Sequence, residues 1–214
     1  MLTPEEKKEM FLAREAAKQP IEIITSPDLF STPHALASEM VDCAFMLGRN
    51  SGWRSLVNGE PMRVLEPSAG TGNLANAFRA HVVQLDRPPA YDLTLLELNR
   101  RLCDQLALGF PKAVVACCDF LTIHDPPLLY DMILMNPPFG QAVDIKHIRR
   151  AVTLLRSGGI LVALCANGPR QRRSYNLLCE SYQADYAFYR DLPAGSFKTQ
   201  GTMVNVAMMG LVIK

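Results

Sequence analysis

Apolar residues recur with two different periods along this chain, and the change of period separates predicted helices from predicted strands. The first 18 residues mix Glu and Lys at helical spacing, and Pro20 ends this predicted helix. After the loop Ser26–Pro33 a second helix is predicted, with Thr32 as the N-cap and Pro33 at the first helical position. Its apolar face consists of Leu36, Met40, Cys43, Ala44 and Leu47.

Beyond residue 60, short apolar runs alternate with amphipathic segments. The predicted strands are Arg63–Leu65, Tyr91–Leu96, Ala113–Ala116, Tyr130–Met135, Ile160–Cys165, Ala184–Arg190 and Met203–Ile213. The predicted helices are Asn73–Val83, Asn99–Leu108, Ile145–Arg156 and Gln171–Tyr182. This alternation predicts an α/β fold with a mainly parallel sheet covered by helices on both faces. Because only a loop, Leu192–Gly201, separates the last two strands, we expect one of them to be antiparallel to its neighbours.

Composition narrows the class of protein. The chain has 214 residues, of which 49% are hydrophobic and 20% charged, so a disordered tail protein is excluded. We expect one compact domain with two parts, an N-terminal helical segment (1–60) and a core (61–214). The apolar runs fall far short of the roughly 20 residues that span a bilayer, and no signal-peptide core is present. The six cysteines form no C-x-x-C pair or metal-ligand cluster, so we expect free thiols, no metal and a cytoplasmic location.

Charge is distributed unevenly along the chain. The formal net charge is only +1, which argues against binding nucleic acid by bulk charge alone. Residues 141–173 nevertheless carry seven basic side chains and one acidic one, a net charge of +6. The basic residues of this segment are Lys146, Arg149, Arg150, Arg156, Arg170, Arg172 and Arg173. The segment could form a local nucleic-acid surface or simply be solvated charge on helices.

Three predicted strands each end near an acidic residue. Glu66 begins the turn E-P-S-A-G-T-G, in which Gly70 and Gly72 remove Cβ atoms where a ligand would approach the backbone. The turn lacks both the phosphate-loop ending and the complete G-x-G-x-x-G pattern. Glu97 suits ribose hydroxyls, and Asp119 suits an adenine amino group. Singly, each could be an ordinary turn or an acid at a helix start; jointly, they predict a site for one adenosine-bearing ligand, with Phe120 beside the ring.

The fourth predicted strand ends in Asn136-Pro137-Pro138-Phe139. Consecutive prolines fix φ and remove two backbone donors, so their carbonyls remain available as acceptors. Asn136 adds a side-chain acceptor and Phe139 an aromatic face. This combination fits a planar base with an exocyclic amine, although a rigid turn without chemistry would have the same prolines.

These motifs resemble those of the S-adenosylmethionine-dependent amino methyltransferases, most closely the DNA adenine-N6 family. There, the stretch like Glu66–Gly72 and the acids like Glu97 and Asp119 bind the cofactor, and the motif like Asn136–Phe139 binds the target base. The order of the motifs resembles the family's gamma arrangement. The resemblance implies a class I, Rossmann-like seven-stranded fold, S-adenosylmethionine as cofactor, and DNA as substrate, with RNA as an alternative.

Two flanking segments extend the resemblance to about residues 28–213. Residues 28–33 look like the F-x-T-P element that closes over the methionine end of the cofactor, and residues 192–202 look like the loop that helps to hold a flipped base. The implied cofactor-binding residues are Phe30, Thr32, Pro33, Glu66, Ser68, Gly70, Gly72, Glu97, Asp119, Phe120 and Asn136. The expected substrate-binding residues are Arg170, Arg172, Arg173, Phe197 and Lys198.

The same residues suggest how an amine would be activated. The Asn136 side-chain oxygen and the Pro137 carbonyl would each accept one N6–H, while Phe139 stacks on the ring. His34 and His147 are expected to be structural. The chain has no room for a separate target-recognition domain, so a partner subunit could supply sequence specificity. Alternatives are an RNA amino methyltransferase (adenine N6 or guanine N2), a protein-glutamine methyltransferase, or a catalytically silent subunit; the oligomeric state is left open.

Overall fold

The computed structural model describes residues 31–52, 60–124, 129–198 and 204–214. Seven strands form one sheet in the order β3-β2-β1-β4-β5-β7-β6. The strands are β1 (Met62–Glu66), β2 (Tyr91–Glu97), β3 (Val114–Cys117), β4 (Tyr130–Met135), β5 (Leu155–Ala166), β6 (Asp185–Asp191) and β7 (Val206–Val212). β7 is antiparallel to both β5 and β6, while the described pairs among β1 to β5 are parallel. The predicted α/β class and the single antiparallel strand near the C-terminus are confirmed.

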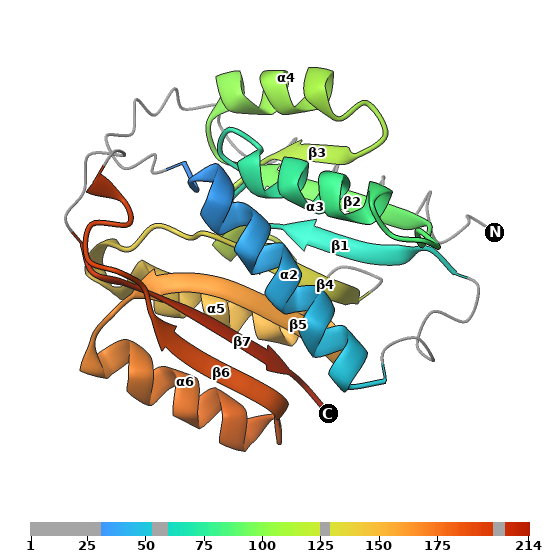
Figure 1. Cartoon of the computed structure of the whole chain (residues 1–214). Coiled ribbons are helices and arrows are strands. Elements are labelled where there is room, and N and C mark those ends of the chain that lie inside the picture. Colours follow the sequence, from blue (N-terminus) through green and yellow to red (C-terminus); the bar gives the residue numbers. More distant parts are fainter. Residues whose placement is uncertain (1–30, 53–59, 125–128, 199–203) are drawn as a thin grey trace.

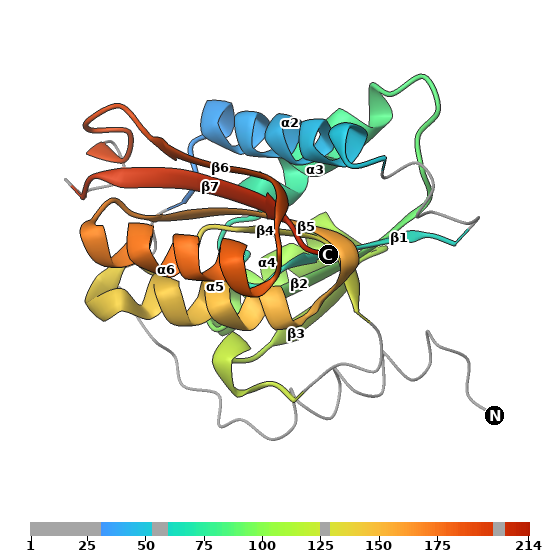
Figure 2. The same ribbon diagram turned by 90° about the horizontal axis from the view of Figure 1, so that it is seen from below.

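Helices cover both faces of the sheet (Figures 1 and 2). The α-helices are α2 (His34–Asn50), α3 (Asn73–Val83), α4 (Arg100–Gly109), α5 (Val143–Thr153) and α6 (Pro169–Ser181), and the short 3₁₀ turns are η2 (Phe120–Thr122) and η3 (Gly140–Ala142). In Figure 2, α2 and α3 lie on one face of the sheet, and α5 and α6 lie side by side on the other. The buried residues of α2 belong to the same apolar cluster as those of the central strands, so this helix is part of the core.

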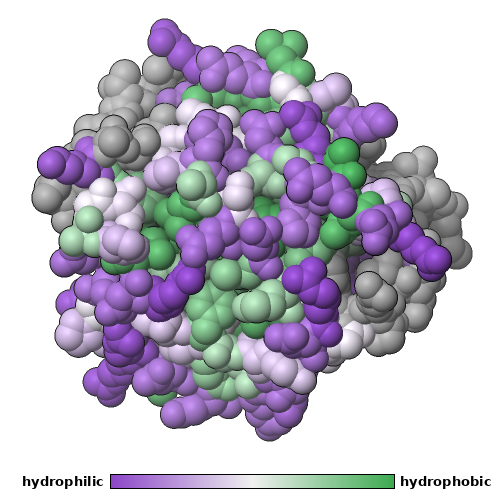
Figure 3. Space-filling model, in the orientation of Figure 1, coloured by the Kyte–Doolittle hydropathy of each residue, from purple (hydrophilic) through white to green (hydrophobic). Residues whose placement is uncertain are grey.

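Each central strand is buried on both faces because its alternate residues enter different apolar clusters. In β4, Met132 and Leu134 belong to the cluster under α2 and α3, whereas Ile133 and Met135 belong to the cluster under α5 and α6. This arrangement is the reason that the strand is apolar throughout. β6, by contrast, is one of the two edge strands, and its side chains are largely exposed. On the face of the molecule that is seen in Figure 1, polar side chains cover most of the surface and apolar ones form separate groups (Figure 3).

The sheet topology creates a crevice between β1 and β4. The chain runs outward from β1 to β2 and β3, then returns to β4 on the other side of β1. At such a reversal of strand order, the loops that follow the neighbouring strands diverge to opposite faces and leave a ligand site at the carboxyl edge. The carboxyl ends of β1, β2, β3 and β4, with the segments that follow them, carry Glu66, Glu97, Asp119 and the Asn136–Phe139 motif, respectively.

Two local predictions are wrong. The helix predicted to reach Arg156 ends at Thr153, because Leu155 already pairs with Tyr130 as the start of β5. Arg156 consequently lies in that strand, where its guanidinium forms an ion pair with the buried carboxylate of Asp131. Likewise, Thr32 is not the N-cap of α2: Pro33 occupies that position without a side-chain cap.

Several other features complete the description. The predicted helix over the first 18 residues and Phe30 lie outside the described residues. All six cysteines are free thiols, as expected. Among the described helices, none combines the length and the apolar character needed to cross a bilayer. The described residues also contain no cluster of three or more His, Cys, Asp or Glu side chains that could hold a metal ion.

Candidate active site

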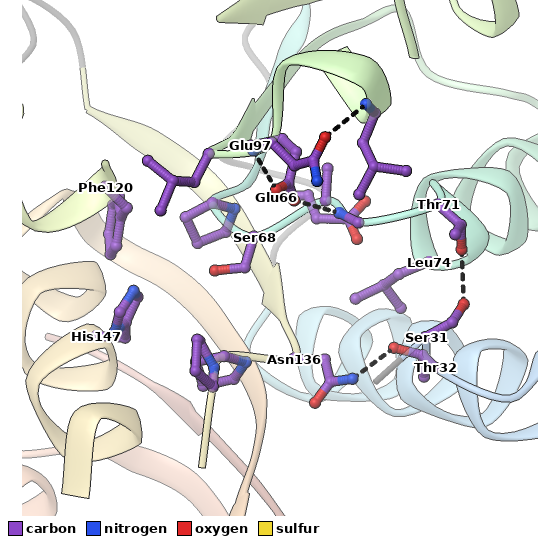
Figure 4. Close-up of a pocket in the computed structure, with 18 of the residues that line it drawn as sticks. Ser31, Thr32, Glu66, Ser68, Thr71, Leu74, Glu97, Phe120, Asn136 and His147 are labelled. Atoms are coloured by element: carbon purple, nitrogen blue, oxygen red, sulfur yellow. Dashed lines mark hydrogen bonds between the residues drawn. The ribbon is translucent and has the colours of Figure 1, made fainter. Parts of the chain in front are cut away.

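A cavity of about 310 Å³ opens at the carboxyl edge of the sheet, in the crevice between β1 and β4. Its wall is built from the segments after the first four strands and from Ser31 and Thr32, which precede α2 (Figure 4). Predicted cofactor residues that line it are Thr32, Glu66, Ser68, Gly70, Glu97, Asp119, Phe120 and Asn136. Thus five stretches that are far apart in the sequence, namely Ser31–Thr32 and the segments after β1, β2, β3 and β4, contribute to one site.

Glu97 joins two of these loops. One carboxylate oxygen accepts a hydrogen bond from the Gly70 backbone N–H (2.8 Å), and the other accepts from the Asn99 N–H (2.8 Å). The carboxylate therefore fixes the β1–α3 turn against the start of α4. Each oxygen has a second lone pair, so Glu97 can also accept from a ligand hydroxyl in the cavity.

Gly72 is needed for a reason different from the predicted one. It adopts φ +79 at the N-cap of α3 and does not line the cavity. A Cβ there would lie 2.9 Å from Leu106 Cδ2 and 2.9 Å from the Phe110 ring. The missing side chain thus allows α4 to pack against the turn, and of the two glycines only Gly70 lines the cavity.

Asp119 and Phe120 form the next part of the wall. Asp119 accepts a hydrogen bond from the Leu121 N–H (2.9 Å) and so caps the short η2 turn. Phe120 is buried, and its ring lies 5.6 Å from the imidazole of His147. Consequently a carboxylate and an aromatic side chain stand together at this end of the cavity, as the sequence predicts for a ring with an amino group.

Glu66 is the most deeply buried acid in the cavity wall, with 4% of its surface exposed. Burial raises the pKa of this carboxyl well above its ordinary value, and the neighbouring Glu97 carboxylate raises the pKa further. A backbone hydrogen bond with Ala75 opposes these effects only in part. Its Oε2 atom has no hydrogen-bond partner among the described residues. A cationic or hydrogen-bond-donating ligand would satisfy such a group.

Asn136 lies at the end of β4, opposite the segment that precedes α2. Its side-chain N–H donates to the hydroxyl of Thr32 (3.0 Å). Figure 4 shows the amide oxygen on the other side of the group, turned away from Thr32. Pro137 and Pro138 continue the cavity wall beside it. The amide and the proline segment therefore share one wall with the acids.

Phe139 and Phe197, predicted from two different motifs, are brought together. Their rings meet edge to face with centroids 5.8 Å apart, and Phe197 is fully buried. Phe139 does not line the cavity, so its stacking on a base remains a prediction. Lys198, next in the chain, is exposed.

His147 lines the cavity, although the sequence suggested a structural role for it. Its Nδ1 atom lies 3.0 Å from the Val143 carbonyl oxygen, one helical turn earlier in α5. Burial lowers the pKa of the imidazole, which favours the neutral ring. Its position on the buried face of α5, three residues after Asp144 and one before Ile148, is the pattern that could have placed it in the wall.

The basic residues do not form one free cluster. Arg172 forms an ion pair with Asp191 (2.8 Å) and lies over the Tyr189 ring. Arg150 donates to the Ile123 carbonyl, and Arg149 donates to Ser174 on α6. Arg156 is the second residue of β5 and lies at the sheet edge opposite the cavity.

The start of α6 directly follows β5 and therefore lies at the same sheet edge as the cavity (Figure 1). Arg170 and Arg173 are exposed there. Among the described residues, neither Arg170 nor Arg173 forms an ion pair, in contrast to Arg172.

With the geometry established, known structures identify the fold. The chain superposes on 23S rRNA methyltransferase ErmE with a TM-score of 0.61 at 16% identity, covering 86% of this chain and 70% of that one. A Pyrococcus horikoshii protein whose proposed activity is RNA methylation gives 0.59 at 18% identity, covering 99% of both chains. The plantazolicin methyltransferase BpumL, solved with S-adenosylhomocysteine, gives 0.59 at 13% identity, covering 98% and 97%.

These likenesses define the class: the chain has the fold of the class I S-adenosylmethionine-dependent methyltransferases. At such low identity they define the fold alone. No protein-family model matches the sequence, and no curated protein matches it.

Proposed function

We propose that the protein is an S-adenosylmethionine-dependent methyltransferase that transfers a methyl group to the N6 amine of adenine in DNA. The observation that carries this proposal is the position of Asn136-Pro137-Pro138 on the wall of the same cavity as three strand-end acids. An amine-binding motif and an adenosine-binding set would then meet at one place. The fold supports the cofactor, because class I methyltransferases share it.

The residues of the cavity fit S-adenosylmethionine. Glu97 would accept from the ribose hydroxyls, and Asp119 would accept from the adenine amino group while Phe120 covers the ring. The buried Glu66, whose Oε2 atom has no partner among the described residues, would favour the positive end of the ligand. When bound, the cofactor supplies an electrophilic methyl group on a sulfonium.

The chain's own contribution to the reaction is positioning. The Asn136 side-chain oxygen and the Pro137 carbonyl would each accept a hydrogen bond from one N–H of the substrate amine. These two bonds would withdraw the nitrogen lone pair from the ring and aim it at the methyl group. No general base is required before transfer, because the proton can leave afterwards. The neutral imidazole of His147 is held by its own helix and takes no part in this step.

Replacement of Asn136 tests the proposal. We expect Asn136→Ala to leave the dissociation constant for S-adenosylmethionine within about two-fold of the wild-type value, and to reduce methyl transfer by roughly 100-fold or more. Calorimetry gives the first quantity, and incorporation of tritiated methyl groups into adenine-containing oligonucleotides gives the second. Asn176→Ala, at an exposed position of α6, is the matched control and should retain both. Near-normal transfer by Asn136→Ala would contradict the proposed role.

RNA is the second candidate substrate, because two of the structural neighbours are described as RNA methyltransferases. The same amine chemistry applies to adenine in RNA and, with the N2 amine, to guanine. Separate DNA and RNA pools should therefore be methylated in parallel, digested, and analysed for the modified nucleoside. N6-methyldeoxyadenosine from the DNA pool supports the DNA proposal. A methylated ribonucleoside from the RNA pool alone would replace it with the RNA activity.

A further inference from the structure

A chain of hydrogen bonds between residues of the cavity wall connects the β1–α3 turn to the end of β4. Asn73, the first residue of α3, donates from Nδ2 to the Ser31 hydroxyl (2.9 Å) and to the Thr32 carbonyl (2.9 Å). The Ser31 hydroxyl is also 2.6 Å from that of Thr71. From the same segment, the Thr32 hydroxyl accepts from the Asn136 side chain. Figure 4 shows the Thr71–Ser31 and Thr32–Asn136 bonds of this chain.

We propose that Thr32 is a positioning residue for the Asn136 amide, an inference that rests on the proposed amine methylation. The resemblance to F-x-T-P assigns this threonine to the cofactor. The structure adds contacts on the other side, because its side-chain hydroxyl meets the amide of the amine-binding motif and its backbone carbonyl meets Asn73. Thr32 would thus act on the substrate amine through Asn136 and need not touch the substrate.

Asn136 needs a positioning residue because the two ends of its carboxamide differ in hydrogen bonding: the oxygen accepts and the NH₂ group donates. The terminal torsion of asparagine is broad and close to two-fold, so its oxygen and its NH₂ group can exchange places at small cost. Only the oxygen can accept a hydrogen bond from the N–H of an amine, because the NH₂ end is itself a donor. The Thr32 hydroxyl can bond to either end of the amide, and in this structure it accepts from Nδ2, so that the oxygen is on the opposite side of the group. Loss of the hydroxyl would release the amide from this position. Thr32 is 6% exposed, so water competes little for its hydroxyl.

Asn73 in turn fixes the position of Thr32. Its two bonds hold the Ser31 hydroxyl and the Thr32 backbone carbonyl against the first turn of α3. That turn follows the loop that contains Gly70, which lines the cavity. The orientation of Asn136 is therefore tied to the loop that would bind the cofactor, and the two halves of the active site are positioned by one segment.

The test compares two substitutions in the full chain. Thr32→Val keeps the shape of the side chain and removes the hydroxyl, whereas Thr32→Ser keeps the hydroxyl. Thr153→Val, at an exposed position at the end of α5, is the control for replacement of a threonine as such. Three quantities are measured: the dissociation constant for S-adenosylmethionine, the single-turnover rate on a single-stranded adenine oligodeoxynucleotide at saturating cofactor, and the ¹⁵N resonances of the Asn136 side chain, assigned with Asn136→Ala.

We expect Thr32→Val to lower the single-turnover rate about ten-fold, the equivalent of one lost hydrogen bond, with little change in the dissociation constant. The Asn136 side-chain resonance should shift in Thr32→Val and stay near its wild-type position in Thr32→Ser, which should recover most of the rate. An unchanged rate in Thr32→Val would overturn the proposal. A loss of cofactor affinity as large as the loss of rate would also overturn it, in favour of a direct cofactor contact.

Failure of the proposed function gives a different result. If the wild-type protein methylates neither DNA nor RNA, the proposed methyl transfer is rejected. The Asn136 resonance then decides alone, because it reports the contact without catalysis. A resonance that Thr32→Val leaves unmoved would overturn the contact as well, whereas a shifted one would confirm the Thr32–Asn136 contact while its role in methyl transfer falls with the proposed function.

Discussion

The carboxyl groups of Glu66 and Glu97 differ in burial and in hydrogen bonding. Glu97 satisfies both oxygens with backbone N–H groups, whereas Glu66 is buried with one oxygen unpartnered among the described residues. Burial therefore raises the pKa of Glu66, as does the charge of Glu97. The folded protein binds a proton at Glu66 more tightly than the unfolded chain does.

A pH dependence of stability follows for the ligand-free protein. Because the folded-state pKa of Glu66 is raised, its contribution to stability is fully present below the ordinary glutamate pKa of about 4.3 and is lost as pH rises toward the folded-state value. We expect the free energy of unfolding of the wild type to fall relative to that of Glu66→Gln as pH rises from 5 to 8. Urea unfolding of both proteins across that range measures the difference. Parallel pH profiles would show that Glu66 does not titrate differently on folding.

At the scale of elements, the β1–α3 turn and α4 depend on each other. The turn places Gly70 and Glu66 at the cavity, and α4 closes over it because Gly72 has no side chain. Leu106 and Phe110 occupy the space that a side chain would need. A change made for packing would therefore also disturb the loop that lines the cavity.

Two glycine substitutions test this dependence. Gly72→Ala combines positive φ with contacts of 2.9 Å, and we expect it to cost about 1–2 kcal/mol of stability and to weaken S-adenosylmethionine binding. Gly109→Ala, in α4, meets nothing within 4 Å and should be neutral or stabilising by up to about 1 kcal/mol. Thermal unfolding and calorimetric titration of both variants give the comparison. Equal effects at the two positions would contradict the packing argument.

At the scale of the whole molecule, the problem is how a chain of net charge +1 would hold a nucleic acid. The positive segment 141–173 is largely tied into the fold, since Arg149, Arg150, Arg156 and Arg172 have partners within the protein. Phosphate contacts would then come from a smaller set at the carboxyl edge of the sheet. Such contacts position a substrate without reading its sequence, so we expect weak, salt-sensitive binding with little specificity.

The salt dependence of binding separates free from engaged arginines. We expect Arg170→Ala/Arg173→Ala to flatten the plot of log affinity against log salt by roughly one for each lost phosphate contact. Arg172→Ala is the matched control on the same helical turn, and should change the slope little because its charge is paired with Asp191. Cofactor binding should be unchanged in both, since none of the three lines the cavity. A wild-type slope in the double variant would direct the search to the exposed Lys198.

The sequence by itself determined the α/β class, the bounds of several elements and the four strand ends that carry chemistry. The ranges of α3 and β4 are predicted to the residue, because capping, turn residues and apolar period are local properties of the chain. The places of Glu66, Glu97, Asp119 and Asn136 follow from the same logic, since parallel strands end at one edge.

Tertiary structure alone decided which of those side chains meet. Thr32 looked like a helix cap and instead accepts from Asn136, 104 residues away. The helix predicted to reach Arg156 stops at Thr153, because pairing with β4 extends β5 back to Leu155. Gly72 serves α4, and His147 enters the cavity wall. In each case the local pattern fixes what a residue can do, whereas its partner is set by the packing of segments that are distant in the chain.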